Sequence, residues 1–272
     1  MDSVSGSPEL FNEQAGFFDQ RAGLPTDCCR DIAKTAVEIG KAGPSDLVVE
    51  VGPGTGQIGQ WFKAPVRYVG FDLSAGMLKE FRRRLGRDSD HCTLIQADAN
   101  TGWPVAHGAA RVIFSSRTIH LLNHEQVASE VFRTASPAGA TLLLGRVQRD
   151  SDSVKERMAK EMIERLRAHG FEGRRRERQN RKLLESCERL GAEILKTVCV
   201  AKWRVSATPR QSLDSWQRLS GLGGIPVPDT VRAEIFRELE VWSEGVFGGL
   251  DEEFEFEETY VLKPLAIPST HH

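Results

Sequence analysis

The chain has 272 residues, a length that suits one enlarged domain or two small ones. Its 40% hydrophobic and 27% charged residues are ordinary for a globular protein, and a formal net charge of −2 gives no overall attraction to nucleic acid or a membrane surface. No window approaches the roughly 18 apolar residues of a membrane span, and residues 1–7 lack the basic and apolar regions of a signal peptide.

Cysteine usage indicates a reducing compartment. The five cysteines are odd in number and none forms a C-x-x-C pair. This pattern predicts reduced thiols, mostly core residues, in a cytoplasmic protein. The histidines and cysteines are scattered, so we expect no metal site.

The first 45 residues are expected to be helical. Glu9–Arg21 carries three phenylalanines and few breakers, which is typical of a helix that either packs on the core or covers a ligand. A second helix is predicted from Pro25 to about Gly40.

The stretch Leu47–Gly56 is the one around which the chain is organised. It reads Leu-Val-Val-Glu-Val-Gly-Pro-Gly-Thr-Gly, a Val-rich buried strand that runs into three glycines at alternate positions. The glycines permit a tight turn and a close approach of backbone to a ligand. A helix start is predicted at residues 57–62, so strand, turn and helix N-terminus would form a nucleotide-type crevice.

Strands and helices then alternate as far as Gly145. Helices are predicted from the N-cap Ser74 and over Glu125–Thr134. Further strands are predicted at 66–71, 92–96, 110–114 and 141–145. The alternation favours a doubly wound, mostly parallel α/β sheet.

The later part of the chain is expected to complete a single domain. Helices are predicted at 151–168, 174–190, 210–219 and 229–244, and strands within 192–205 and at 253–262. The last strand alternates phenylalanine with glutamate, which suits a half-exposed antiparallel strand. We therefore divide one domain, 1–272, into N-terminal helices (1–45), a ligand-binding half (46–149), a helical cap (150–173 and 206–250) and the rest of the core (174–205 and 251–265).

The glycine turn is compatible with two kinds of ligand. Gly54–Gly59 satisfies G-x-G-x-x-G, and Asp72 lies near the place of the ribose-binding acid of an NAD enzyme. However, Glu50 places a costly carboxylate inside the apolar strand, and Asp98 follows the third strand. Three successive strands thus carry an acid near their carboxyl ends, where ligands of open α/β sheets bind.

These motifs resemble the class I S-adenosylmethionine-dependent methyltransferases, of the small-molecule type related to quinone-biosynthesis enzymes. The resemblance covers about residues 45–146. Its motifs are Glu50–Gly56, Gly70–Ser74 with Met77-Leu78, Gln96–Ala99, and more loosely Phe114–Ser116 with Ile119–Leu122. It implies a seven-stranded Rossmann-like methyltransferase fold with an antiparallel last strand, and S-adenosylmethionine as cofactor.

The resemblance also implies roles for individual residues. Asp72 would hold both ribose hydroxyls, and Asp98 would accept from the adenine amino group, although Asp also favours turns and caps. The remaining implied cofactor residues are Arg21, Glu50, Gly52, Gly54, Gly56, Leu73, Met77, Ala99 and Ser115. Arg21 is equally compatible with a surface position.

Methyl transfer requires alignment of donor and acceptor and exclusion of water. His120 is the best-placed base if the acceptor needs one, or else a residue that supports the pocket. We predict transfer to a small organic acceptor in secondary or specialised metabolism. Candidates for an apolar acceptor wall, or plain core, are Met158, Met162, Trp203, Trp216 and Trp242.

Three alternatives remain open on the sequence. The glycine fingerprint favours an NAD(P)-dependent oxidoreductase, and a protein that binds S-adenosylmethionine without methylating anything would keep the same motifs. Residues 174–182 hold six basic residues in nine, which an RNA methyltransferase could use, although a solvated helix face explains them more simply. Nucleic acid is therefore not the expected partner.

Overall fold

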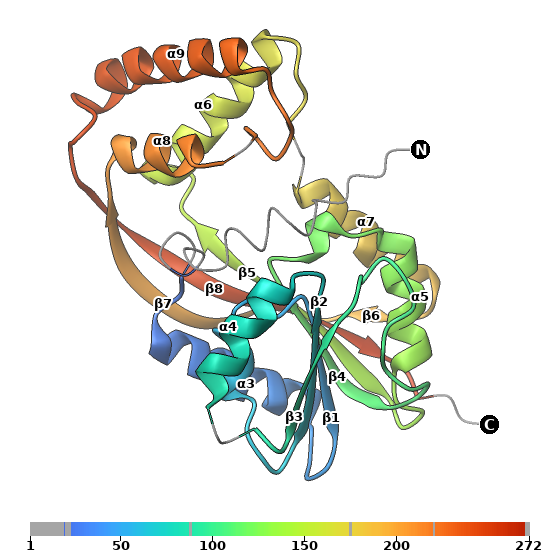
Figure 1. Cartoon of the computed structure of the whole chain (residues 1–272). Helices are drawn as coiled ribbons and strands as arrows, with labels where there is room; N and C mark the ends of the chain where they lie inside the picture. The colour runs from blue at the N-terminus through green and yellow to red at the C-terminus, as the bar shows by residue number, and fades with distance from the viewer. Residues whose placement is uncertain (1–18, 20–22, 87–88, 174–175, 220, 270–272) are drawn as a thin grey trace. The chain divides into compact units, whose positions relative to one another are not determined.

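The computed structural model describes the chain apart from residues 1–18, 20–22, 87–88, 174–175, 220 and 270–272. The described residues form two compact units (Figure 1). Unit 1 comprises those up to Arg146, those in Arg176–Ala201 and those from Tyr260 onward. Unit 2 comprises Val147–Arg175 and Lys202–Thr259.

The sheet has the strand order β3-β2-β1-β4-β5-β8-β6, and β7 pairs with β8. Its strands are β1 (Leu47–Val51), β2 (Arg67–Asp72), β3 (Cys92–Gln96), β4 (Ala110–Ser116), β5 (Ala140–Arg149), β6 (Glu193–Ile194), β7 (Val198–Ala207) and β8 (Phe254–Ile267). The first five are parallel in register, whereas β6 pairs antiparallel with β8. This confirms the predicted doubly wound, mostly parallel sheet with an antiparallel last strand.

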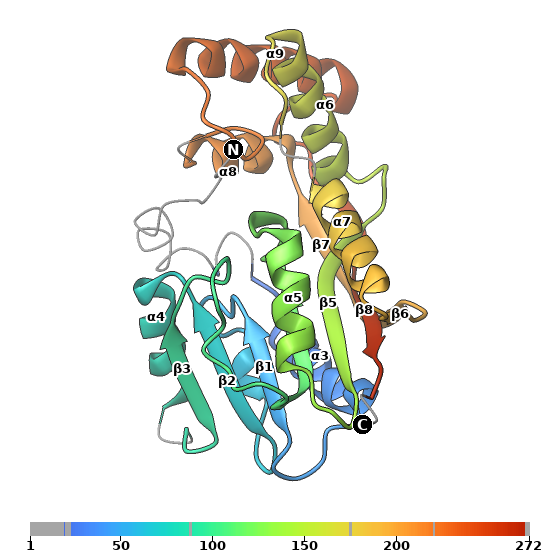
Figure 2. The ribbon, with the colours of Figure 1, turned by 90° about the vertical axis from the view of Figure 1, so that its right-hand side faces the viewer.

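Helices cover both faces of the sheet in unit 1. Figure 2 shows α5 and α7 in front of the strands and α3 behind them. The helices are α3 (Thr26–Gly40), α4 (Ala75–Leu85), α5 (His124–Thr134) and α7 (Arg176–Arg189). The predicted N-cap Ser74 is confirmed, because its side chain accepts from the Met77 N–H. The Asn123 side chain, which was not predicted as a cap, accepts from the Glu125 and Gln126 N–H groups at the start of α5.

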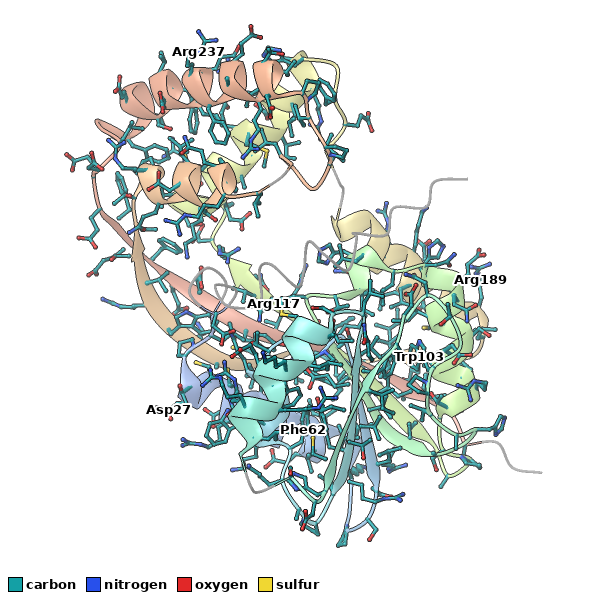
Figure 3. The ribbon with its side chains drawn as sticks, in the orientation of Figure 1. Asp27, Phe62, Trp103, Arg117, Arg189 and Arg237 are labelled. Atoms are coloured by element: carbon teal, nitrogen blue, oxygen red, sulfur yellow. The ribbon has the colours of Figure 1, made fainter. Side chains whose placement is uncertain are left out.

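The two faces of β1 bury different kinds of side chain. Val49 and Val51 join an aliphatic core with residues of α5 and α7, and Trp103 packs there against the Phe71 ring. On the other face, Phe62 stacks on Tyr68 at a ring-centroid distance of 5.5 Å. Figure 3 marks Phe62 and Trp103, which belong to these two layers. Aromatic pairs of this kind each add about 0.5–1.5 kcal/mol beyond area burial.

Two elements differ from the sequence prediction. The helix expected at residues 57–62 is only the 3₁₀ turn η1 (Gly59–Trp61), because Pro65 and the start of β2 leave no room for a longer helix. The long strand predicted within residues 192–205, at Val198–Trp203, is confirmed as β7, but the two-residue strand β6 before it was not predicted. Among the described residues the sheet therefore has eight strands, one more than predicted.

Unit 2 has its own core. Figure 1 shows α6 (Val154–Ala168), α8 (Pro209–Gln217) and α9 (Asp229–Phe247) grouped together. Ser153 caps α6, and Thr208 forms a reciprocal capping box with Gln211 at the start of α8. Met158 is fully buried and Met162 nearly so, and both belong to this core with Trp216 packed against it. These residues therefore support the helices of unit 2, and the division of one domain into core and cap stays a prediction.

Three further expectations can be compared with the described residues. All five cysteines lie in the described part of the chain, and each is a free thiol. Across the described residues, no helix is both long enough and apolar enough to traverse a bilayer. The same residues contain no cluster of three or more His, Cys, Asp or Glu side chains suited to a metal ion.

Candidate functional site

The carboxyl ends of β1, β2 and β3 bring the predicted acidic residues to one edge of the sheet. Glu50 pairs with Gly70 across β1 and β2, and Asp72 pairs with Gln96 across β2 and β3. Asp98 follows β3 by two residues. Because parallel strands end at the same edge, the sequence spacing becomes spatial proximity, as expected for this sheet type.

The glycine turn needs glycine at all three alternate positions, for different reasons. Gly52, Gly54 and Gly56 have φ values of 71°, 57° and 78°, in the left-handed region. A Cβ on Gly52 would overlap the Thr118 side chain, and one on Gly56 would overlap the Phe81 ring. A Cβ on Gly54 would meet nothing within 4 Å. Only Gly54 therefore faces open space, and only there can a ligand approach the backbone of the turn.

Asp72 joins this turn to β2. Its Oδ2 accepts from the Gly54 N–H at 3.0 Å, and its Oδ1 accepts from the Ser74 N–H at 2.9 Å. Burial raises the pKa of the Asp72 carboxyl, and the backbone N–H groups of Ser74, Gly54 and Leu73 oppose that rise. Each carboxylate oxygen still has a second lone pair, so Asp72 can accept two further hydroxyl groups beside the open side of Gly54.

Glu50 is not brought to the open side of the turn. Its side chain is 2% exposed, and its Oε2 accepts from the Tyr68 hydroxyl at 2.6 Å. Burial raises the pKa of Glu50 to about 7, and the Tyr68 hydrogen bond opposes the rise. Its hydrogen-bond partner Tyr68 gave no signal in the sequence. Glu50 thus lies behind the turn among the aromatic side chains, and direct contact with a cofactor stays a prediction.

The predicted adenine side of the site is partly formed by local turn chemistry. Asp98 Oδ1 accepts from the backbone N–H and the side-chain amide of Asn100, at 2.8 and 3.0 Å. Such Asx turns are common for aspartate. They agree with the alternative interpretation of Asp98 as a residue that stabilises a local turn. Ala99 and Met77 are buried and Leu73 is half-buried, which gives this side the apolar character expected of it.

The loop after β4 is hydrogen-bonded to the end of β1 and to the first glycine of the turn. The buried Ser115 donates its hydroxyl to the Val51 carbonyl at 2.9 Å, and Thr118 donates its hydroxyl to the Gly52 carbonyl at 3.1 Å. Ser115 therefore ties β4 to β1, and Thr118 is a residue that sequence reasoning missed. His120 lies half-buried in the 3₁₀ turn η2 (Ile119–Leu121).

Arg117, labelled in Figure 3, has a strained backbone in the same loop. Its φ of 62° lies in the left-handed region, which costs a residue with a Cβ about 1–2 kcal/mol. Strain of this kind gathers at functional sites. The predicted cofactor residue Arg21 lies outside the described residues, as do the side chains of Arg174, Arg175, Arg176 and Arg178 in the basic run.

A cavity of about 130 Å³ lies beside the glycine turn, within unit 1. Its lining residues are Asp19, Gly23, Leu24, Thr26, Cys29, Gln57, Gln60, Trp61 and Arg84. The buried Nε1 of Trp61 has no hydrogen-bond partner among the residues that the structure describes. Burial raises the pKa of the Cys29 thiol to about 11, so this cysteine is protonated and a poor nucleophile at neutral pH.

Comparison with known proteins gives the site a family context. Residues 48–139 match the model of a methyltransferase domain. No protein of curated function matches the sequence of the chain.

Solved structures share the fold at low sequence identity. A methyltransferase candidate from Bacillus halodurans is 17% identical, with 87% of this chain and 98% of that chain covered and a TM-score of 0.55. The YcgJ protein of Bacillus subtilis is 18% identical, with 88% and 97% covered and a TM-score of 0.52. The [4+2]-cyclase SpnF is 15% identical, with 89% and 81% covered and a TM-score of 0.52.

Proposed function

We propose that a small organic molecule is the methyl acceptor of this chain, which is a class I S-adenosylmethionine-dependent methyltransferase. The family match spans the strand ends that carry Glu50, Asp72 and Asp98. The observation that carries the proposal is the open backbone of Gly54 held against the Asp72 carboxylate. A ligand that lies over a glycine and offers paired hydroxyls to an acid fits this geometry.

The residues present fit S-adenosylmethionine, which supplies an electrophilic methyl group when bound. Asp72 would accept from the two ribose hydroxyls, and Gly54 would let the methionine part lie against the backbone. Contact of the cofactor with Gly52 stays a prediction. Asp98 would accept from the adenine amino group through the lone pairs that Asn100 leaves free. Further predicted contacts are those of Arg21, Glu50, Gly56, Leu73, Met77, Ala99 and Ser115.

His120 is our candidate for the base. It follows β4 at the carboxyl edge of the sheet, on the 3₁₀ turn η2 that continues the loop of Thr118. A base there would remove a proton from an acceptor hydroxyl or amine during transfer. Replacing His120 with Gln should lower kcat and leave the KM for S-adenosylmethionine nearly unchanged, because the side chain acts on the acceptor.

One structural feature argues against the alternative of an NAD(P)-dependent oxidoreductase. A pyrophosphate site uses the N-terminus of the helix after the glycine turn, and this chain has only the three-residue turn η1 there. Asp98 has no role in that scheme. Calorimetry with S-adenosylmethionine and with NAD separates the two, since we expect binding of the first alone and its loss in Asp98→Ala.

The acceptor class requires a turnover experiment. Labelled S-adenosylmethionine is supplied with a metabolite extract in one arm and total RNA in another. We expect label in small molecules and production of S-adenosylhomocysteine, as suits an enzyme of specialised metabolism in the cytoplasm. Label in RNA instead would contradict the small-molecule acceptor. Binding without turnover in either arm would favour a non-methylating protein, and a [4+2]-cyclase does share this fold.

A further inference from the structure

Thr55 is held at two points by residues that are far away in the sequence. It is 2% exposed and stands between Gly54 and Gly56, both in the left-handed region. Its hydroxyl donates to Asp19 Oδ1 at 2.6 Å, and its carbonyl accepts from Arg84 Nε at 3.1 Å. The centre of the glycine turn is thus fixed by one residue before the first strand and one near the end of α4.

Asp19 and Arg84 also bind each other. Arg84 Nη2 donates to Asp19 Oδ2, and the Gln57 side-chain amide donates to Asp19 Oδ1. Both charged side chains are only partly exposed, at 36% for Asp19 and 27% for Arg84. Hydrogen bonds that involve an ionised group are stronger than neutral ones, and partial burial limits their screening by salt.

A second connection attaches Leu24 to the residue that follows the glycine turn. The Leu24 N–H donates to Gln57 Oε1 at 3.1 Å, so Asp19 and Leu24 both contact the residue directly after Gly56. A Cβ on Gly23 would overlap the Asp19 carbonyl, so Gly23 lies directly against Asp19. Asp19 and Leu24 are therefore attached to the turn at Thr55 and Gln57.

We propose that Asp19 and Arg84 are positioning residues that hold the glycine turn in the shape that accepts S-adenosylmethionine, an inference that rests on the proposed function. Asp72 fixes the Gly54 N–H from one side, and the Asp19–Arg84 pair fixes Thr55 from the other. Glycines have wide conformational freedom, so a turn with three of them needs such external contacts to keep one shape.

The test compares Asp19→Asn and Arg84→Gln with two controls on exposed ion pairs. Asp27→Asn removes an acid that is 86% exposed beside Arg30, and Arg83→Gln removes the exposed neighbour of Arg84 that pairs with Glu80. Calorimetry measures Kd for S-adenosylmethionine and S-adenosylhomocysteine. Hydrogen exchange of peptides that cover residues 52–58 measures the order of the turn without any ligand.

We expect both variants to weaken both ligands about tenfold and to speed exchange in the turn, with neither effect in the controls. With an acceptor in hand, the KM for S-adenosylmethionine should rise while kcat stays within about twofold, because neither residue touches the reacting atoms. The double variant should lose less affinity than the sum of the two single losses, since both substitutions break the contact between Asp19 and Arg84.

The inference is overturned if the wild type binds S-adenosylmethionine and the two variants match their controls in Kd and in exchange. It is also overturned if the variants only lower the melting temperature, since that is the result of a merely structural ion pair. Absence of binding in the wild type would instead refute the proposed function, and this inference with it.

Discussion

At the scale of single residues, the buried Glu50 and the half-buried Asp72 of neighbouring strands have different surroundings. Asp72 accepts from two backbone N–H groups, which stabilise its ionised form, whereas Glu50 has one neutral hydroxyl partner. Burial dominates for Glu50 and raises its pKa to about 7. Asp72 is therefore suited to remain an acceptor at neutral pH, while Glu50 responds to pH near neutrality.

Replacement of Asp72 by Asn should weaken S-adenosylmethionine binding roughly 10–100-fold, since an unpaired buried donor costs about 1–3 kcal/mol and about 1.4 kcal/mol is tenfold in affinity. The reason is that the two N–H groups contact different oxygens, so the amide nitrogen must face one of them. Asp46→Asn is the matched control, because Asp46 accepts from the Gly43 N–H through Oδ2 alone. Equal Kd values by calorimetry in the two variants would refute this role of Asp72.

The raised pKa of Glu50 predicts a loss of stability as pH rises. The folded chain keeps a proton on Glu50 up to about pH 7, whereas the unfolded chain releases it near 4.5. The folded state thus binds more protons between these values, and the free energy of unfolding falls by about 3 kcal/mol over this window.

Urea unfolding from pH 4.5 to 8 compares the wild type with Glu50→Gln, which keeps an acceptor for the Tyr68 hydroxyl. The variant should lack the Glu50 contribution, so the difference between the two curves should grow as pH rises and level off above pH 7. Parallel curves would show that Glu50 ionises normally in the folded chain.

At the scale of elements, substitutions of the turn glycines can distinguish an effect on ligand affinity from an effect on the stability of the fold. Gly54→Ala places a methyl group in open space where the cofactor is proposed to lie, so affinity should fall at least tenfold while stability falls by about 1–2 kcal/mol from backbone strain. Gly86→Ala is the matched control, with a φ of 63° and equally open surroundings after α4. It should lose the same stability and no affinity, as thermal unfolding and calorimetry will measure.

Gly56→Ala should instead disrupt the fold, because the new methyl group overlaps the Phe81 ring within the core. Overpacking of a tight core costs about 1–3 kcal/mol in addition to the strain. Thermal unfolding should therefore rank Gly56→Ala well below the other two variants. If Gly54→Ala bound the cofactor as tightly as Gly86→Ala does, the open side of the turn would not be the binding surface.

The elements of this chain were predictable where local pattern decides them. The Val-rich run before Gly52 and the N-cap Ser74 determine β1 and α4 from nearby residues. The shortness of the turn η1 was not predictable, because it depends on how soon β2 must begin. The short strand β6 was missed because it depends on pairing with β8, which is distant in the sequence.

The site was predictable to the same degree. Sequence spacing after parallel strands located Asp72 beside Gly54, since that arrangement follows from the sheet itself. Tyr68 and Thr118 were missed because their contacts depend on side-chain packing across strands and loops. Asp19 and Arg84 were missed because 65 residues separate them and no local pattern links them.

At the scale of the whole molecule, the two units have separate cores. The aliphatic core of unit 1 gathers residues of β1, α5 and α7, and the core of unit 2 gathers those of α6, α8 and α9. Every described residue that we propose to contact the cofactor belongs to unit 1. Cofactor binding should therefore stabilise unit 1 directly. Whether it also stabilises unit 2 tests whether the chain unfolds as the single domain predicted from its sequence.

Hydrogen exchange with and without S-adenosylmethionine measures that spread. At a ligand concentration of 100 Kd, binding stabilises the state that binds it by about 2.7 kcal/mol, so opening reactions of unit 1 should slow about 100-fold. We expect this protection in peptides that cover β1, β2 and α4, and none in those that cover α6 and α9, because the core of unit 2 is built from its own residues. NAD serves as the control ligand and should protect neither set. Equal protection of α6 and α9 would contradict independent units and show that the chain opens as one cooperative domain.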